Sequence, residues 1–207
     1  PARRPVQTVD KRGRQPTYSY VDDYDSVAGN IRRTTVVEGV GTPSTRTTVY
    51  TRDRTAATLL KEVRAGLETT YTRNARRQPI SVTRREIPSG AVRTTSMTYC
   101  EQAGADSSQC PLVGLLLSVD GPRTDVSDLT TYVYYPADDQ GCATGAVCRW
   151  RKGDLWKVTT PGRQVTETLA YDAAGRVASA KDASGVITDF EYDLRGRFVA
   201  RTVRGTN

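Results

Sequence analysis

The chain has 207 residues, enough for one domain or a small array with a buried core. It contains no histidine, which excludes His-dependent catalytic triads, histidine general bases and histidine metal ligands. Thr, Val and Tyr are abundant and Leu is sparse, which favours strands over helices. The longest apolar run, residues 112–117, is too short to span a membrane.

The net charge of +7 is unevenly distributed along the chain. Residues 1–100 contain 18 basic and 9 acidic side chains, whereas residues 101–207 contain 12 and 14. A basic first half attracts polyanions, so weak polyanion binding is one expectation. Its arginines are scattered singly and in pairs, which favours ordinary solvated strand faces over a binding patch.

A spacing of 21 residues first appears in this basic half. Tyr50-Thr-Arg-Asp and Tyr71-Thr-Arg-Asn lie 21 residues apart, and Val9-Asp-Lys-Arg-Gly-Arg contains a D-x-x-G-R turn signal. The composition of residues 55–67 is compatible with a short helix. Because the flanking tyrosines keep the repeat period, we predict a strand pair there instead.

Four cysteines flank two polar insertions. Cys100 and Cys110 bracket the first, and Cys142 and Cys148 bracket the second. Four cysteines permit three pairings, of which local pairing is the simplest because each bridge staples the base of one loop. A four-thiolate zinc site is disfavoured because C-x-x-C spacing is absent. Disulfides place the chain outside the cytoplasm.

Hairpins are predicted on both sides of the second insertion. One runs from residue 115 to residue 135 with a turn at 120–122, and another runs from 153 to 171 with a turn at 160–163. Trp150 and Trp156 stand where the insertion rejoins the second hairpin. We expect them to pack into the β-ribbon there rather than to form a platform for binding sugars.

The clearest repeat closes the sequence. Y-D-x-x-G-R occurs twice, 21 residues apart, with Asp182-Ala-Ser-Gly between the two copies. Asp at the first turn position accepts backbone N–H bonds, and Gly at the fourth adopts positive φ. The residues from 186 to 192 alternate between two faces, as strands do. The signature residues are Tyr171, Asp172, Gly175, Arg176, Tyr192, Asp193, Gly196 and Arg197.

This motif and period resemble the YD-repeat, or Rhs-repeat, family, strongly over residues 153–207 and more weakly over 1–152. The resemblance implies repeated hairpins in a long ribbon that spirals into a hollow shell, which in bacterial members encloses a toxin polypeptide. It also implies that the repeats carry no chemistry. Family toxins end the shell with a D-P-x-G-L type motif, which this sequence lacks.

The tyrosines at positions 50, 71, 171 and 192 are predicted to be equivalent, each fixing the register of neighbouring hairpins. Aspartate clusters at 22–25, 138–139 and 120–128 are considered as acid–base pairs or a calcium site. Their surroundings and irregular spacing favour solvated turns. Nucleotide-binding and nucleophile motifs are absent from the sequence.

We therefore predict an all-β meander of hairpins with repeats of about 21 residues, forming a curled ribbon or part of a hollow shell. Residues 1–152 form a divergent, insertion-rich region and residues 153–207 form regular repeats. The predicted role is a secreted or surface-exposed, non-catalytic scaffold without metal or cofactor. Its expected partners are the remainder of a larger Rhs-type polypeptide, an enclosed toxin, or further copies of itself. The alternatives are an adhesin-like module that binds polyanions or carbohydrates, and a filament subunit.

Overall fold

The structure is a computed structural model and describes residues 6–9, 15–26, 28–102, 110–145, 147–162 and 164–205. The chain divides into two compact units, residues 1–95 and 96–207. The predicted division at residue 152 concerned how regular the repeats are, and it stays a prediction. No helix in the described ranges has the length and apolar character needed to cross a membrane.

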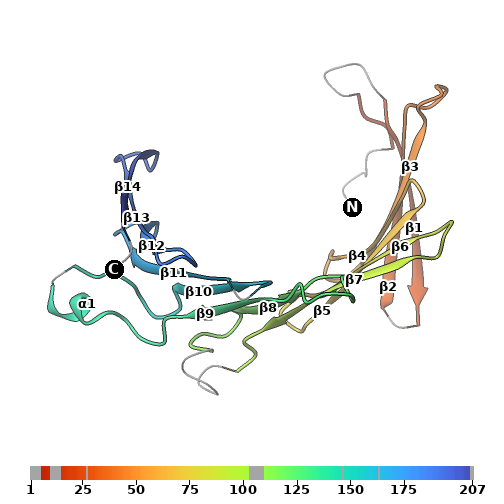
Figure 1. Ribbon diagram of the computed structural model, residues 1–207. Helices are drawn as coiled ribbons and strands as arrows, with labels where there is room; N and C mark the ends of the chain where they lie inside the picture. The colour runs from red at the N-terminus through yellow and green to blue at the C-terminus, as the bar shows by residue number, and fades with distance from the viewer. Residues whose placement is uncertain are drawn as a thin grey trace. The chain divides into compact units, whose positions relative to one another are not determined.

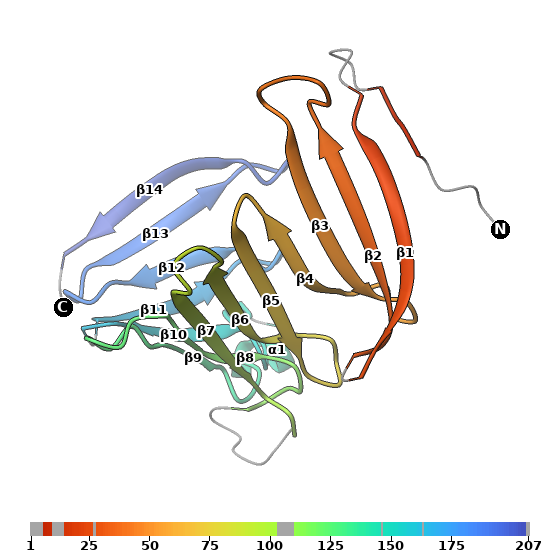
Figure 2. The same cartoon turned by 90° about the vertical axis from the view of Figure 1, so that its right-hand side faces the viewer.

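Hydrogen bonding joins the strands in chain order, from β1 to β14. Each strand thus lies beside its chain neighbour (Figures 1 and 2), and the register of the paired strands is antiparallel throughout. β1 and β14 stand at the two ends of this order, so the sheet is not closed by pairing between them. The predicted all-β meander of hairpins is confirmed.

The first unit is built from threonine-rich and valine-rich strands. Its elements are β1 (Thr17–Asp25), β2 (Gly29–Glu38), β3 (Arg46–Asp53), β4 (Leu59–Arg64), β5 (Leu67–Arg73), β6 (Pro79–Glu86) and the first half of β7 (Val92–Tyr99). The strand pair predicted within residues 55–67 is confirmed by β4 and the turn into β5. Ala65 and Gly66 form that turn, and both have positive φ, as a two-residue hairpin requires.

The second unit contains the remaining hairpins. Its elements are the end of β7, β8 (Leu116–Asp120), β9 (Thr130–Tyr134), α1 (Gln140–Thr144), β10 (Leu155–Thr160), β11 (Gln164–Tyr171), β12 (Val177–Lys181), β13 (Ile187–Tyr192) and β14 (Phe198–Arg204). The hairpins predicted at 115–135 and 153–171 are confirmed as β8–β9 and β10–β11. Figure 1 shows α1 in the insertion between β9 and β10, a helix that the sequence pattern does not predict.

Buried apolar side chains are few in the part of the chain that the structure describes. They are Ile31 in the first unit and Cys100, Cys110, Pro111, Tyr134 and Tyr135 in the second. Thr48, Thr51, Thr168 and Ser179 are also buried, although they are polar. With so little core, the sheet depends on turn geometry and on contacts between neighbouring strands. Those contacts recur along the second unit.

Candidate functional site: repeat turns and aromatic contacts

Three turns in the second unit share one hydrogen-bond pattern. In the first, the N–H of Asp172 donates to the carbonyl of Arg176 (2.8 Å), and the N–H of Gly175 donates to the carbonyl of Asp172 (3.0 Å). The Asp172 carboxylate accepts the N–H groups of Ala174 and Arg176, both at 2.9 Å. The turns that begin at Asp182 and Asp193 repeat all four bonds. Asp thus caps each turn, as its position in the motif predicts.

Glycine is the residue best suited to the fourth position of these three turns. Gly175, Gly185 and Gly196 have φ of +76°, +85° and +80°. This left-handed conformation places the Cβ of any other residue too close to the following carbonyl oxygen. The D-x-x-G spacing is therefore a direct consequence of the backbone geometry.

Arginine at the fifth position completes two of the turns. The Arg176 Nε donates to Asp172 at 2.6 Å, and the Arg197 Nε donates to Asp193 at 2.7 Å. The Arg176 guanidinium lowers the pKa of Asp172 below its usual value. The backbone N–H of Arg197, followed by its guanidinium, does the same to the pKa of Asp193. Both carboxylates therefore stay ionised into the acidic range.

A tyrosine closes the open end of three hairpins. Tyr171 ends β11 and donates its hydroxyl to the carbonyl of Leu155, the first residue of the partner strand (2.7 Å). Tyr192 does the same to Val177 at 3.0 Å. The third member is Tyr134, which donates to Leu116 at 2.6 Å and whose pKa is raised by burial. We call these three side chains the hairpin tyrosines.

Tyr134 is a repeat tyrosine that sequence reasoning missed. It lies 37 residues before Tyr171 instead of 21, because the insertion that contains α1 separates the two hairpins. The available signal was its position at the end of a predicted strand. The 21-residue spacing does not reveal this tyrosine, because the insertion changes its distance from the next one.

The hairpins are also joined to one another. The Arg176 guanidinium lies 4.5 Å from the centroid of the Tyr192 ring while it remains paired with Asp172. Arg176 thus links the turn of one repeat to the tyrosine of the next. This contact gives the 21-residue period a physical basis, because residues of consecutive repeats pack against each other.

The four predicted equivalent tyrosines fall into two sets. Asp53 and Asn74 begin turns in the first unit, and both side chains cap backbone N–H groups. The backbone bonds at Asn74 match those of the later turns, whereas the turn at Asp53 is one residue longer, because the Asp53 N–H donates to the carbonyl of Thr58. Tyr50 and Tyr71 lie three residues before these turn starts, whereas Tyr171 and Tyr192 lie one residue before theirs. Each earlier tyrosine is covered by the arginine two residues further on, Arg52 or Arg73. The prediction that all four tyrosines occupy one equivalent position is wrong, although the 21-residue spacing holds within each pair.

The D-x-x-G-R signal near the N-terminus starts at Asp10. Residues 10–14 lie outside the described ranges, so that turn stays a prediction.

An aromatic stack anchors the insertion between β9 and β10. Tyr135 lies between the rings of Trp150 and Trp156, with centroids 4.5 and 5.5 Å away, and donates its hydroxyl to the carbonyl of Thr168 (2.6 Å). Burial raises the pKa of Tyr135 to about 12. Arg149 covers the Trp150 ring and pairs with Asp139, whose pKa it lowers. The predicted packing role of both tryptophans agrees with this arrangement.

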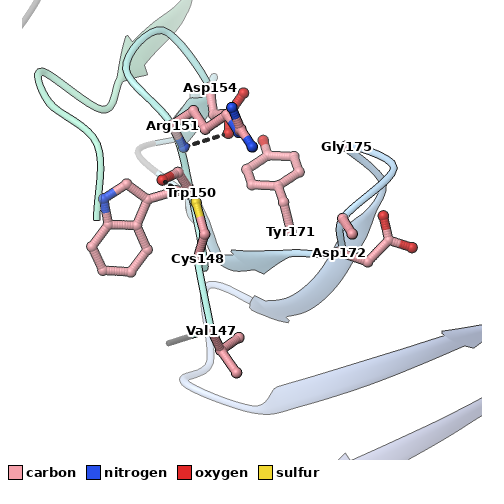
Figure 3. Close-up of a pocket in the computed structure, with 9 residues that line it drawn as sticks. Val147, Cys148, Trp150, Arg151, Asp154, Tyr171, Asp172 and Gly175 are labelled. Atoms are coloured by element: carbon pink, nitrogen blue, oxygen red, sulfur yellow. Dashed lines mark hydrogen bonds between the residues drawn. The ribbon is translucent and has the colours of Figure 1, made fainter. Parts of the chain in front are cut away.

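A pocket of about 420 Å³ lies where the insertion meets the first repeat turn (Figure 3). The Tyr171 side chain points toward Arg151 and Asp154, whereas the Trp150 indole points away from the Tyr171 ring. Asp154 accepts the backbone N–H of Arg151 at 2.7 Å. The N–H of Tyr171 donates to the carbonyl of Arg149, so backbone bonding also joins the two walls. These contacts identify the pocket as a structural junction.

The four cysteines pair locally. Cys100 and Cys110 have Cα atoms 5.3 Å apart, and Cys142 and Cys148 have Cα atoms 4.3 Å apart, with the sulfurs at bonding distance in both pairs. Cys142 lies within α1 and is tied to Cys148 beyond the end of the helix, and Cys148 lines the junction pocket. Each pair staples one insertion.

The aspartate clusters considered as catalytic or metal sites are occupied by structural contacts. Asp22 pairs with Arg32, Asp125 pairs with Arg123, and Asp128 accepts the backbone N–H of Arg123. Asp138 accepts the N–H of Lys152 at 2.7 Å. Within the described ranges, no three acidic or cysteine side chains are grouped as a metal site would require.

These features define the chain as an antiparallel β-repeat protein whose repeats are fixed by capped turns and tyrosine hydroxyls. Residues 171–207 match the family model described as RHS Repeat. The matched segment begins at Tyr171 and contains all eight signature residues, so the resemblance found in the sequence is confirmed there. No curated protein matches the chain.

Proposed function

We propose that the chain is a non-catalytic wall segment of a larger RHS-type scaffold that encloses or presents a polypeptide, as in toxin delivery. The observation that carries this proposal is the Asp172–Arg176–Tyr192 link between consecutive hairpins. Such a link stabilises a ribbon that can be extended one repeat at a time. The polar atoms of the repeat turns are used in holding the ribbon together, which supports a structural role.

The expected location is outside the cell or at its surface. Two local cysteine pairs support an oxidising compartment, because disulfides persist there and are rare in the cytosol. Together with the RHS repeat match, they favour a secreted or surface-exposed scaffold.

A binding module for polyanions is the second candidate, and it rests on the basic first half. Several arginines of the first unit are already paired with carboxylates, Arg32 and Arg54 with Asp22 and Arg33 with Asp23. This pairing reduces the charge available to a polyanion. Binding dominated by such charges must weaken steeply with salt, so release from heparin at very low salt rejects this candidate.

The native, non-reduced mass of the protein isolated from its source tests the scaffold. We expect a second polypeptide to be retained, or the chain to be found within a longer RHS-repeat polypeptide, with both cysteine pairs oxidised. A long series of identical subunits supports the filament alternative instead. A bare monomer with four free thiols contradicts both the scaffold and its compartment.

A further inference from the structure

The first unit contains a pocket of about 560 Å³, whose lining includes Tyr71 and Arg73, the arginine that covers the Tyr71 ring. Its lining comes from one end of β1 to β5 and from the β1–β2, β3–β4 and β5–β6 turns at that end. The buried Ile31 and Thr51 contribute to it, together with the more exposed Thr70. Charged side chains of both signs complete the lining, among them Arg73 and Arg77. The volume is within the range of sites for small molecules.

Arg77 occupies a position where the other repeat turns have glycine. In the turn from Asn74 to Gln78, the N–H of Asn74 donates to the carbonyl of Gln78, and the N–H of Arg77 donates to the carbonyl of Asn74. Asn74 caps the N–H of Gln78 at 2.9 Å. These bonds match those of the turn at Asp172, with Arg77 in place of Gly175. Arg77 has φ of +64°, which is strained for any residue with a Cβ.

Strain of this kind is informative when the residue has another use. A glycine would relieve it, as it does in the three later turns. The chain instead places a cationic side chain there, and that side chain lines the pocket. The departure from the turn pattern therefore coincides with the site.

Arg73 provides a second, independent indication. Two backbone carbonyls hold its guanidinium, those of Arg77 at 3.1 Å and Leu59 at 3.4 Å. Its Nε is buried and makes no hydrogen bond. Across the described ranges, no carboxylate lies within ion-pair distance of Arg73 or Arg77. A buried donor without an acceptor is costly, and an oxyanion supplies the missing acceptor once the side chain turns its Nε toward the pocket, because this nitrogen has no contact with solvent in the unliganded arrangement.

The carboxylates of the pocket have partners of a different kind. Asp25 accepts the backbone N–H of Ala28 at 2.9 Å, and Glu68 pairs with Lys61 at 3.3 Å. Asp53 uses one oxygen to cap the N–H groups of Thr55 and Ala56. The second oxygen of Asp53 suits a hydroxyl donor, as do the threonine hydroxyls of the lining. The pocket thus combines guanidinium groups for an anion with acceptors for hydroxyl groups.

We propose that this pocket binds a small hydroxylated carboxylate, of the size and class of a uronic acid. Arg73 and Arg77 bind the carboxylate, because guanidinium groups match its planar geometry and can donate two parallel bonds. The polar side chains around Asp53 and Thr51 bind the hydroxyl groups. The proposal does not depend on the scaffold function, since a wall segment can carry such a site or lack it.

The test uses the whole chain and calorimetric titration with glucuronate, glucose and inorganic phosphate as separate probes. We expect glucuronate to bind and glucose to bind at least about tenfold more weakly, because a lost charge-assisted hydrogen bond is worth a factor of this size. Binding of phosphate alone overturns the assigned ligand class. Absence of glucuronate binding overturns the proposal.

Two variants separate ligand binding from folding. Arg77→Gly removes the guanidinium and relieves the backbone, so we expect glucuronate binding to weaken about tenfold or more while the melting temperature stays equal or rises. Arg73→Lys keeps the charge but loses the Nε donor, and we expect a similar loss. Ala65→Gly relieves positive φ at a turn outside the pocket, and Arg93→Lys changes an exposed arginine; both should bind like the unaltered protein. Unchanged glucuronate affinity in Arg77→Gly contradicts the proposal.

Discussion

The Arg176 guanidinium lies 4.5 Å from the centre of the Tyr192 ring, and the two residues belong to consecutive repeats. Arg176 is also paired with Asp172 in its own turn. One arginine therefore connects the cap of one hairpin with the tyrosine that closes the next. The same network explains why Asp, Arg and Tyr recur together at a fixed period.

Replacing Arg176 with lysine should weaken this connection. Lysine keeps the charge but loses the planar group that stacks on the ring, so we expect a loss of about 0.5–1 kcal/mol in unfolding free energy. Trp150 and Trp156 are the only tryptophans of the chain, and both lie in the second unit. Urea denaturation followed by their fluorescence therefore reports on this unit. Arg197→Lys is the control, because Arg197 pairs with Asp193 and covers no aromatic ring in the described ranges; equal losses in both variants argue against the connection.

Removing the Tyr192 hydroxyl should open one end of the β12–β13 hairpin. Tyr192→Phe leaves the carbonyl of Val177 without this donor, and we expect a loss of about 0.5–1.5 kcal/mol. Tyr132→Phe is matched to it, since the Tyr132 hydroxyl makes no hydrogen bond to any described residue. The comparison requires the same tryptophan-monitored denaturation. A Tyr192→Phe protein as stable as the Tyr132→Phe protein would show that the hydroxyl contributes nothing.

A side chain at Gly175 should strain the first repeat turn. Gly175 has φ of +76° and open space around its Cβ position, so Gly175→Ala changes the backbone energy without a clash. We expect a loss of about 1–2 kcal/mol in unfolding free energy. Gly205→Ala has equally open space and no positive φ, and should have little effect. Similar effects at both positions would mean that φ is not the cause.

Acid should weaken the repeat turns. The folded pKa values of Asp172 and Asp193 are lower than their ordinary value, 3.8. Their contribution to stability is therefore complete above about pH 4 and is lost as the pH falls through the lower folded values. Asp172→Asn keeps the backbone cap, as Asn74 does in its turn, but loses the ion pair. Denaturation between pH 2 and 5 should show a smaller loss on acidification in this variant; an identical pH profile contradicts the assignment.

Opening the second cysteine pair should loosen the insertion. A loop of this length gives about 2–3 kcal/mol in the chain-entropy model, and the double variant Cys142→Ser/Cys148→Ser should lose about that amount. Peptide mapping without reduction checks the pairing itself. Peptides that join Cys142 or Cys148 to Cys100 or Cys110 would contradict local pairing.

The sequence was most informative where turn chemistry decides the structure. Asp182 and Gly185 predict a turn without any tyrosine, because each residue has its own backbone role. Spacing was less reliable than chemistry. An insertion hides Tyr134. A shift of two residues keeps a side chain on the same face of a strand, so Tyr50 and Tyr71 have the same 21-residue spacing as Tyr171 and Tyr192 but a different position relative to the turn.

The pocket in the first unit could not be predicted from the sequence. Arg77 gives no signal there, since the fourth position of a turn is recognised by its glycine. Only the backbone bonds of Asn74 show that the turn is of the same kind. The unsatisfied Nε of Arg73 likewise depends on packing between strands.

The most direct test of the scaffold role is protease resistance of a polypeptide retained by the protein isolated from its source. The native complex and the same sample denatured beforehand are digested in parallel and analysed by mass spectrometry. The account predicts that the retained polypeptide survives in the native complex and is degraded after denaturation. Equal degradation in both samples would contradict it, as would a protein isolated neither with a retained polypeptide nor within a longer RHS-repeat polypeptide.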